Sequence, residues 1–232
     1  MVLGLLHYTY LTMSVIVSLC VALLVRRYLT QRTTLTLAFT AFMVSYAINA
    51  FLFAVRGFFL DGSPEEVLLW RLTNVMYVAM VIPLAVFLAY PYLQEKAGTT
   101  KATMVKLVIG FSFVVAIFNL MMVAVSEVDP TYVDDYGLPH YQLVSFIPNT
   151  YVLTLFLVIL VGLFSPVFLI IGARRETDSF YRNRALMLAV GWVVVIIGQV
   201  LMLNRTLVIA NPFVTLAGLL LIVTAVLRKK GV

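Results

Sequence analysis

VLLWRLTNVMYVAMVIPLAVFLAYPYL, residues 67–93, is the stretch that decides the fold of this chain. It exceeds the roughly 20 apolar residues that a helix needs to cross a bilayer. Arg71, Asn74 and Tyr77 recur at helical spacing in its first half, whereas residues 78–89 carry no polar side chain. A charged group inside a membrane helix is costly and must face protein or water. The segment therefore predicts both a transmembrane span and a functional site.

The composition places the whole chain in a membrane. Of its 232 residues, 63% are hydrophobic and 11% are charged, and the mean hydropathy is +1.06. A soluble domain is about 45–50% apolar and about 25% charged. We interpret the net charge of +6 as loop charges that set topology, not as a nucleic-acid-binding surface. The single cysteine, Cys20, excludes an internal disulfide framework.

Seven apolar stretches predict an all-α membrane protein, a seven-transmembrane helix bundle that forms one domain over residues 1–232. The predicted spans are 5–25, 34–55, 67–93, 107–126, 149–171, 185–203 and 207–227. The first is not a signal peptide, because Arg26 and Arg27 follow its apolar region and no Lys or Arg precedes it. No linker or low-complexity tract indicates a second domain.

Basic residues occur in every second connection. They follow spans one, three, five and seven, as Arg26, Arg27 and Arg32, then Lys96, Lys101 and Lys106, then Arg174, Arg175, Arg182 and Arg184, then Arg228, Lys229 and Lys230. Two of the other connections hold acidic residues, which are Asp61, Glu65 and Glu66, then Glu127, Asp129, Asp134 and Asp135. Because short cytoplasmic loops carry the excess of Lys and Arg, we expect the N-terminus outside and the C-terminus in the cytoplasm of a cell-membrane protein.

One connection, residues 127–148, is long, acidic and interrupted by Pro130, Pro139 and Pro148. Long loops without secondary structure are often functional, so one interpretation is a lid over an outer opening. The alternative is a solvated connector whose tyrosines lie at the level of the lipid headgroups.

With this orientation, polar side chains within the spans concentrate in the outer half of the bundle. We predict an outward-facing pocket for a small polar or anionic ligand, lined by Arg71, Asn74, Tyr77, Tyr46, Asn49, Asn119, Gln199 and Arg205. In the alternative interpretation these groups join helices by hydrogen bonds, and Arg71 reaches the headgroups or pairs with Glu65 or Glu66. The inner halves hold little more than the small hydroxyls of Ser18, Thr40, Ser112, Ser165 and Thr224.

Several kinds of chemistry lack the residues they need, so we expect no enzyme, no cofactor and no metal. The last predicted span has no lysine for a retinal Schiff base, and the only histidines are His7 and His140. A metal site of these histidines with Asp134 or Asp135 is a weak alternative, because no ligand spacing defines it. Transport is a third functional hypothesis, but transporter sites lie near the midplane, where this chain has no polar lining.

Two segments carry a family resemblance. LLWRLTNVMYVAMVIPLAVFLAYPYL (68–93) has an early tryptophan and a late proline, and YRNRALMLAVGWVVVIIGQVL (181–201) begins with basic residues and contains glycine. At spans two, three and six the chain resembles the seven-helix N-terminal sensor region of prokaryotic histidine kinases and related signalling proteins. The resemblance implies an outward-facing sensing bundle whose last helix passes a shift to a cytoplasmic output.

The chain ends five residues after the last predicted span, at Val232. We therefore expect a stand-alone sensor that signals through a partner, a fragment, or a protein that is not a sensor. A cytoplasmic or membrane partner would dock on the basic inner face of Arg174, Arg175, Arg182, Arg184 and Arg228. If these residues only orient the protein, they contact anionic lipid instead. The second functional hypothesis is a non-catalytic integral subunit of a larger membrane complex.

Overall fold

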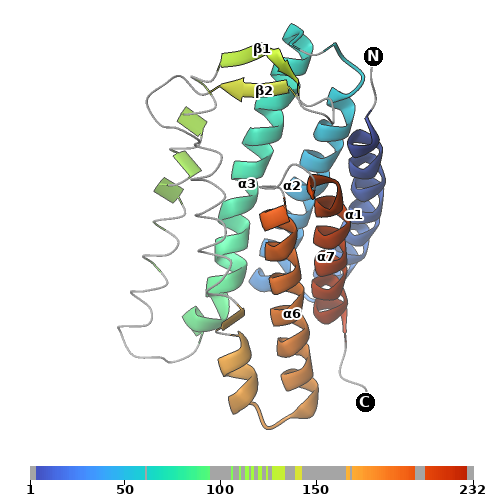
Figure 1. The fold of residues 1–232 in the computed structure, drawn as a ribbon. Helices are drawn as coiled ribbons and strands as arrows, with labels where there is room; N and C mark the ends of the chain where they lie inside the picture. Colours follow the sequence, from blue (N-terminus) through green and yellow to red (C-terminus); the bar gives the residue numbers. More distant parts are fainter. Residues whose placement is uncertain are drawn as a thin grey trace.

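The computed structural model describes residues 4–60, 62–94, 127–133, 139–142, 166–167, 169–201 and 207–228, with isolated helical residues between 106 and 124. Its helices are α1 (Leu5–Thr30), α2 (Thr34–Arg56), α3 (Pro64–Gln94), α6 (Ser179–Leu201) and α7 (Asn211–Leu227), and the 3-10 turn η1 (Val208–Ala210) precedes α7. Helices that follow each other along the chain, such as α1 and α2 or α6 and α7, run antiparallel, whereas the neighbours α1 and α7 run in the same direction (Figure 1). Helix α2 packs between α1 and α3, while α7 packs on α6 and α1.

The helices bear out the coarse prediction of a helical, multi-pass membrane protein. Among the described residues, α1, α2 and α6 are long and apolar enough to cross a membrane, and α7 is a shorter apolar helix. Predicted spans one, two, three, six and seven coincide with α1, α2, α3, α6 and α7. Spans four and five lie largely outside the described residues, although residues 169–175 are helical. Seven spans therefore stay a prediction.

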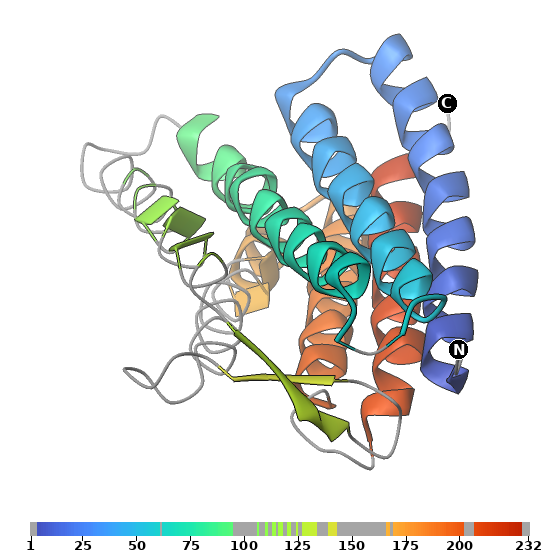
Figure 2. The ribbon, with the colours of Figure 1, turned by 90° about the horizontal axis from the view of Figure 1, so that it is seen from above.

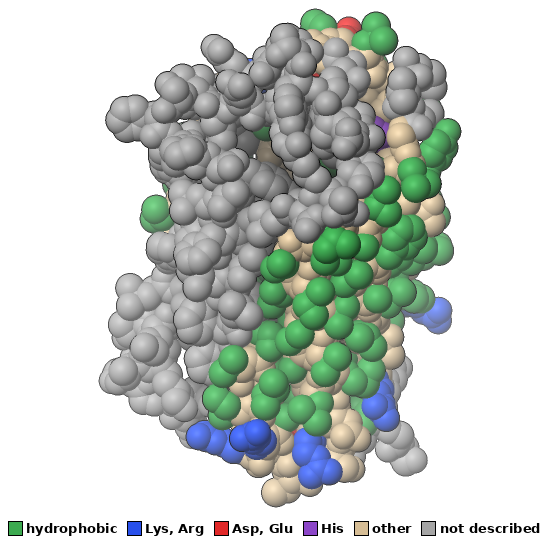
Figure 3. All heavy atoms as spheres, viewed as in Figure 1, with side chains coloured by type: hydrophobic (Ala, Val, Ile, Leu, Met, Phe, Trp, Pro, Cys, Tyr) green, Lys and Arg blue, Asp and Glu red, His purple; other side chains and the backbone are tan. Residues whose placement is uncertain are grey.

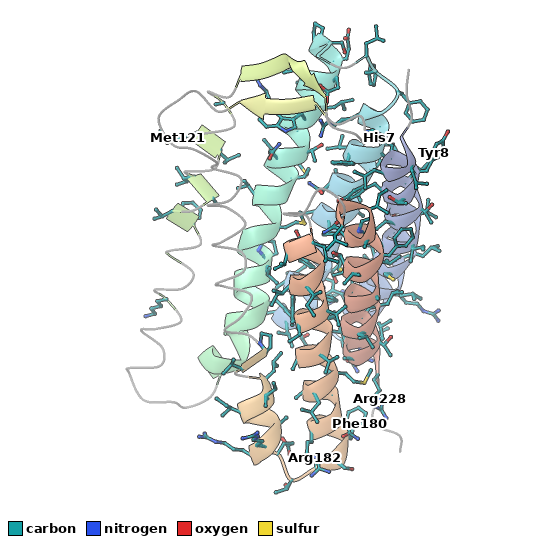
Figure 4. All side chains as sticks on the ribbon, in the orientation of Figure 1. His7, Tyr8, Met121, Phe180, Arg182 and Arg228 are labelled. Carbon is teal, nitrogen blue, oxygen red and sulfur yellow. The ribbon has the colours of Figure 1, made fainter. Side chains whose placement is uncertain are left out.

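The bundle has two chemically different ends. We call the end where α1 and α7 finish and α2 and α6 begin the basic end, and the opposite end the acidic end. Lys and Arg side chains gather at the basic end of the face in Figure 3, and apolar side chains cover its middle. Arg182 and Arg228 lie at the basic end, whereas His7 and Tyr8 lie near the acidic end (Figure 4).

Seen from above, α1, α2 and α3 form a row against which α6 and α7 pack (Figure 2). The layers meet in an aromatic cluster of Phe39, Phe42, Phe87 and Trp192. The rings of Phe39 and Phe87 are 4.9 Å apart between centroids, and those of Phe42 and Trp192 are 5.9 Å apart. All four side chains are buried. The cluster thus joins α2, α3 and α6 without any polar group other than the indole N–H.

Glycines allow α6 and α7 to approach closely. A Cβ atom on Gly191 would lie 2.6 Å from Cγ1 of Ile222, and one on Gly218 would lie 2.7 Å from the carbonyl oxygen of Gly191. A Cβ on Gly198 would overlap the hydroxyl of Thr215. Small residues at such crossings let backbones touch, which is a main source of helix association in lipid.

Two features depart from the expected boundaries. Helix α7 begins at Asn211, not at residue 207, because Pro212 in its first turn has a backbone angle that favours a helix start. The long connection is not entirely irregular: β1 (Glu127–Val133) and β2 (Pro139–Gln142) form an antiparallel pair at the acidic end (Figure 1). The register shifts between Val128 and Val133, around Pro130, which has no N–H for a sheet.

The glycine contacts predict that Gly218→Ala destabilises the protein. The added methyl group meets backbone atoms of α6 that cannot rotate away, so α6 and α7 must separate, and overpacking of this kind costs about 1–3 kcal/mol. Gly172→Ala is the matched control, because a Cβ at Gly172 has nothing within 4 Å and alanine favours a helix more than glycine does. Denaturation in detergent compares the variants. Equal stability of the two would contradict close packing at Gly218.

Candidate functional site

A buried ion pair lies at the acidic end, where α2 turns into α3. The Nε and Nη2 atoms of Arg56 donate to Oε1 of Glu66 at 2.8 and 2.6 Å. The two side chains are only 6% and 2% exposed. Two charges in such a place are stable only when they are paired with good geometry and further polar contacts. Removal of one partner would leave the other charge buried.

Local sequence explains why these two charges meet. Arg56 is the last residue of α2 and Glu66 lies in the first turn of α3. Gly62 has a φ of 74°, which suits glycine, and it completes the turn between the helices. The hydroxyl of Ser63 then accepts from the backbone N–H of Glu66 at 3.2 Å and caps α3. Both charges suit the helix dipoles at their positions.

An aromatic ring of α2 links the pair to a histidine and a tyrosine of α1. The guanidinium carbon of Arg56 lies 5.3 Å from the centroid of the Phe53 ring, a cation–π distance. The Phe53 ring contacts Tyr10 at 4.1 Å and His7 at 5.8 Å between centroids. His7 is 4% exposed, and its ring fills the space that a side chain at Gly57 would need. We call His7, Tyr10, Phe53, Arg56 and Glu66 the acidic-end cluster.

Among the described residues, no hydrogen bond joins one predicted ligand residue to another. Arg71 is exposed, and Glu66, one of its suggested partners, is paired with Arg56. Tyr77 lies on α3, but its side chain is outside the described residues, as are Asn119 and Arg205.

The remaining four predicted residues hydrogen-bond within the bundle. Asn49 donates to the Thr73 carbonyl of α3 at 2.7 Å, and Asn74 donates to the Trp70 carbonyl of its own helix at 2.9 Å. Tyr46 donates to the sulfur of Met13 at 3.7 Å, and Gln199 donates to the Thr215 hydroxyl at 3.4 Å. Three of these four bonds join different helices, as expected if the polar groups serve to hold helices together and do not line a ligand pocket.

Sequence reasoning also missed a polar link through α7. Asn211 is 1% exposed; its Oδ1 accepts from the Tyr10 hydroxyl at 3.0 Å, and its Nδ2 donates to the Gly198 carbonyl at 2.7 Å. One amide thus bonds to α1 and α6 from the first turn of α7. No spacing in the sequence shows which helices face each other, so this link could not be predicted from it.

The described surface also has a groove between α1 and α7. Its volume is about 150 Å³, and its lining contains none of the predicted ligand residues. The lining residues are Tyr8, Thr9, Thr12, Met13, Pro212, Phe213 and Leu216. No group of three His, Cys, Asp or Glu residues in the described part of the chain could hold a metal ion.

Comparison with known proteins adds no relationship. No protein-family model matches the chain, and no curated protein matches its sequence. The resemblance to seven-helix sensor regions therefore stays a prediction that rests on the residue patterns alone.

The ion pair predicts a large difference between two adjacent glutamates. Glu66→Ala leaves Arg56 buried without its carboxylate and lowers the free energy of unfolding by about 3–5 kcal/mol. Glu65→Ala removes the same charge from an exposed position and changes stability by less than about 0.5 kcal/mol. Thermal or denaturant unfolding in detergent measures both. Similar losses for the two variants would mean that the pair is not buried.

The Asn211 link predicts a smaller effect. Tyr10→Phe removes the hydroxyl that donates to Asn211 and lowers stability by about 0.6–1.7 kcal/mol, the range of hydrogen bonds between membrane helices. Tyr8→Phe is the control, because Tyr8 is 53% exposed and points away from the bundle (Figure 4). The same unfolding measurement applies. A neutral Tyr10→Phe variant would count against a stabilising link between α1 and α7.

Proposed function

We propose that this protein is a membrane sensor or receptor-like protein that receives a small polar or anionic stimulus at the acidic end of its bundle. One observation carries the proposal: three helices bring an arginine, a glutamate and a histidine together in a buried cluster at that end. Ionisable groups at such positions in membrane proteins mark functional sites by default. By the predicted topology, the acidic end faces outward.

The cluster suits a sensor because it can bias how helices pack. Arg56 and Glu66 hold α2 to α3, while His7 and Tyr10 hold α1 against the same Phe53 ring. A ligand that interacts differently with two arrangements of these helices shifts the population between them. A change of partner for either charge therefore alters the contacts of α1, α2 and α3 together.

Within this proposal Arg71 is the first contact for an anionic stimulus. It is exposed on α3, five residues after Glu66. Tyr77, Asn119 and Arg205 stay candidate ligand residues. The arginines of the basic end are the proposed docking surface for an output partner.

A second candidate function is a non-catalytic subunit of a larger membrane complex. It is favoured by the hydrogen bonds of Tyr46, Asn49 and Gln199, which join helices and leave those polar groups engaged in packing. In that function the acidic-end cluster stabilises the bundle and binds no stimulus.

Ligand-induced stabilisation separates the two functions. Purified protein is heated with small carboxylates, phosphate or sulfate at matched ionic strength, and unfolding is followed by tryptophan fluorescence. We expect at least one anion to raise the melting temperature of the wild type and of Arg32→Ala, an exposed cation at the basic end, but not that of Arg71→Ala. An equal shift in Arg71→Ala would contradict the role of Arg71. Stoichiometric co-purification of partners, with no anion effect, would favour the subunit function.

A further inference from the structure

An arginine of α6 is fixed against the end of α7. The Nε atom of Arg184 donates to the Ala225 carbonyl at 2.8 Å, and its Nη2 atom donates to the Val226 carbonyl at 3.4 Å. The last carbonyls of a helix have no partner within the helix, so these bonds satisfy the end of α7. They also hold the Arg184 guanidinium, which is half-buried, at one place on the basic end.

A second arginine approaches this position from α1. Arg27 lies in the last turn of α1, and α1 packs on α7 and finishes at the same end of the bundle (Figure 1). Its positive charge opposes that of Arg184. Its Nη1 atom is buried and has no hydrogen-bond partner among the described residues. In the same part of the chain, neither arginine forms an ion pair with a carboxylate.

Two guanidinium groups whose charges oppose each other, and which have no carboxylate partner among the described residues, are unfavourable. Arginine stays protonated in proteins, and a buried donor without an acceptor is costly. Their planar, multiple donors match the oxygens of a phosphate group. The ends of α1, α6 and α7 are where a span would reach lipid headgroups, and anionic lipid attracts basic residues there. Arg228 is engaged elsewhere, since it lies 5.7 Å from the Phe180 ring and donates to the sulfur of Met187.

We propose that Arg27 and Arg184 form a binding site for a phosphate group, supplied by an anionic phospholipid of the leaflet at the basic end. The bound phosphate accepts from both guanidinium groups and removes the repulsion between them. It thereby ties the end of α1 to the α6–α7 pair. This site lies at the opposite end from the acidic-end cluster, and it shares Arg184 with the basic face proposed to dock an output partner.

The test compares two neighbouring arginines. The full chain is placed in nanodiscs, and native mass spectrometry measures retention of phosphatidylglycerol against phosphatidylcholine. Arg27→Gln is expected to bind phosphatidylglycerol about fivefold more weakly than Arg26→Gln, because only Arg27→Gln loses the specific site. Fivefold corresponds to about 1 kcal/mol, the contribution of one arginine near the lipid surface. Arg26 is exposed, and its replacement changes the net charge equally. Equal losses in the two variants would overturn the site.

Two further measurements identify the source of the phosphate and provide a second variant in case Arg27→Gln does not fold. Inorganic phosphate is added to protein in nanodiscs of phosphatidylcholine alone. Stabilisation that depends on Arg27 would assign the site to soluble phosphate and overturn the lipid source. Arg27→Lys keeps the charge but lacks the planar fork, so intermediate retention of phosphatidylglycerol is expected. If Arg27→Gln does not fold, the Arg27→Lys variant is the test. The proposal would be overturned if Arg27→Lys retained phosphatidylglycerol as well as the wild type does and did not respond to inorganic phosphate.

Discussion

The ion pair between Arg56 and Glu66 is the interaction on which the acidic end of this protein depends. It closes the turn from α2 to α3 with both charges away from solvent. The same turn brings Gly57 against the ring of His7, so α1 fits only because the position has no side chain. Phe53 then contacts the arginine and the rings of α1. One charged contact thus sets the relative positions of three helices.

Elsewhere in the bundle, polar and apolar contacts between helices lie at different levels along the helix axes. Toward the acidic end, Asn49 and Asn211 bond across helices. The aromatic cluster around Trp192 fills the layer between α2, α3 and α6. At positions nearer the basic end, Thr40 and Thr224 bond to carbonyls of their own helices at 2.7 and 2.8 Å. Hydroxyls that are satisfied in this way do not join one helix to another.

The helices were predictable from sequence because long apolar runs in lipid have few alternatives to a helix. The roles of the residues that flank these runs were less predictable, and the buried ion pair that two of them form was not predicted. Glu66 was interpreted as a loop charge, and Arg56, one residue beyond its predicted span, was given no role. Arg56 and Glu66 flank a short glycine-containing turn, a pattern that indicates a possible pair only once the turn is known to be tight.

The sequence predicts how deep the candidate ligand residues lie in the bundle, but not which residues they contact. Helical spacing places Asn49, Asn74 and Gln199 at a level in the bundle, and their partners depend on how neighbouring helices are rotated. The close approach of α6 and α7 shows the same limit. Gly191 and Gly198 are seven residues apart and thus share a helix face, but nothing in that spacing names Gly218 and Thr215 as the opposing residues. Strand β1 was missed because Pro130 argues against a strand.

A double-mutant cycle on Arg56 and Glu66 tests the central claim most directly. The unfolding free energies of wild type, Arg56→Met, Glu66→Met and the double variant give the coupling between the two side chains. Each single change should cost about 3 kcal/mol or more, and the double variant should be more stable than either single variant, because two apolar groups can replace a buried pair at little cost. The coupling should therefore exceed the loss caused by either single change. Additive effects of the two changes would contradict a buried pair at the acidic end.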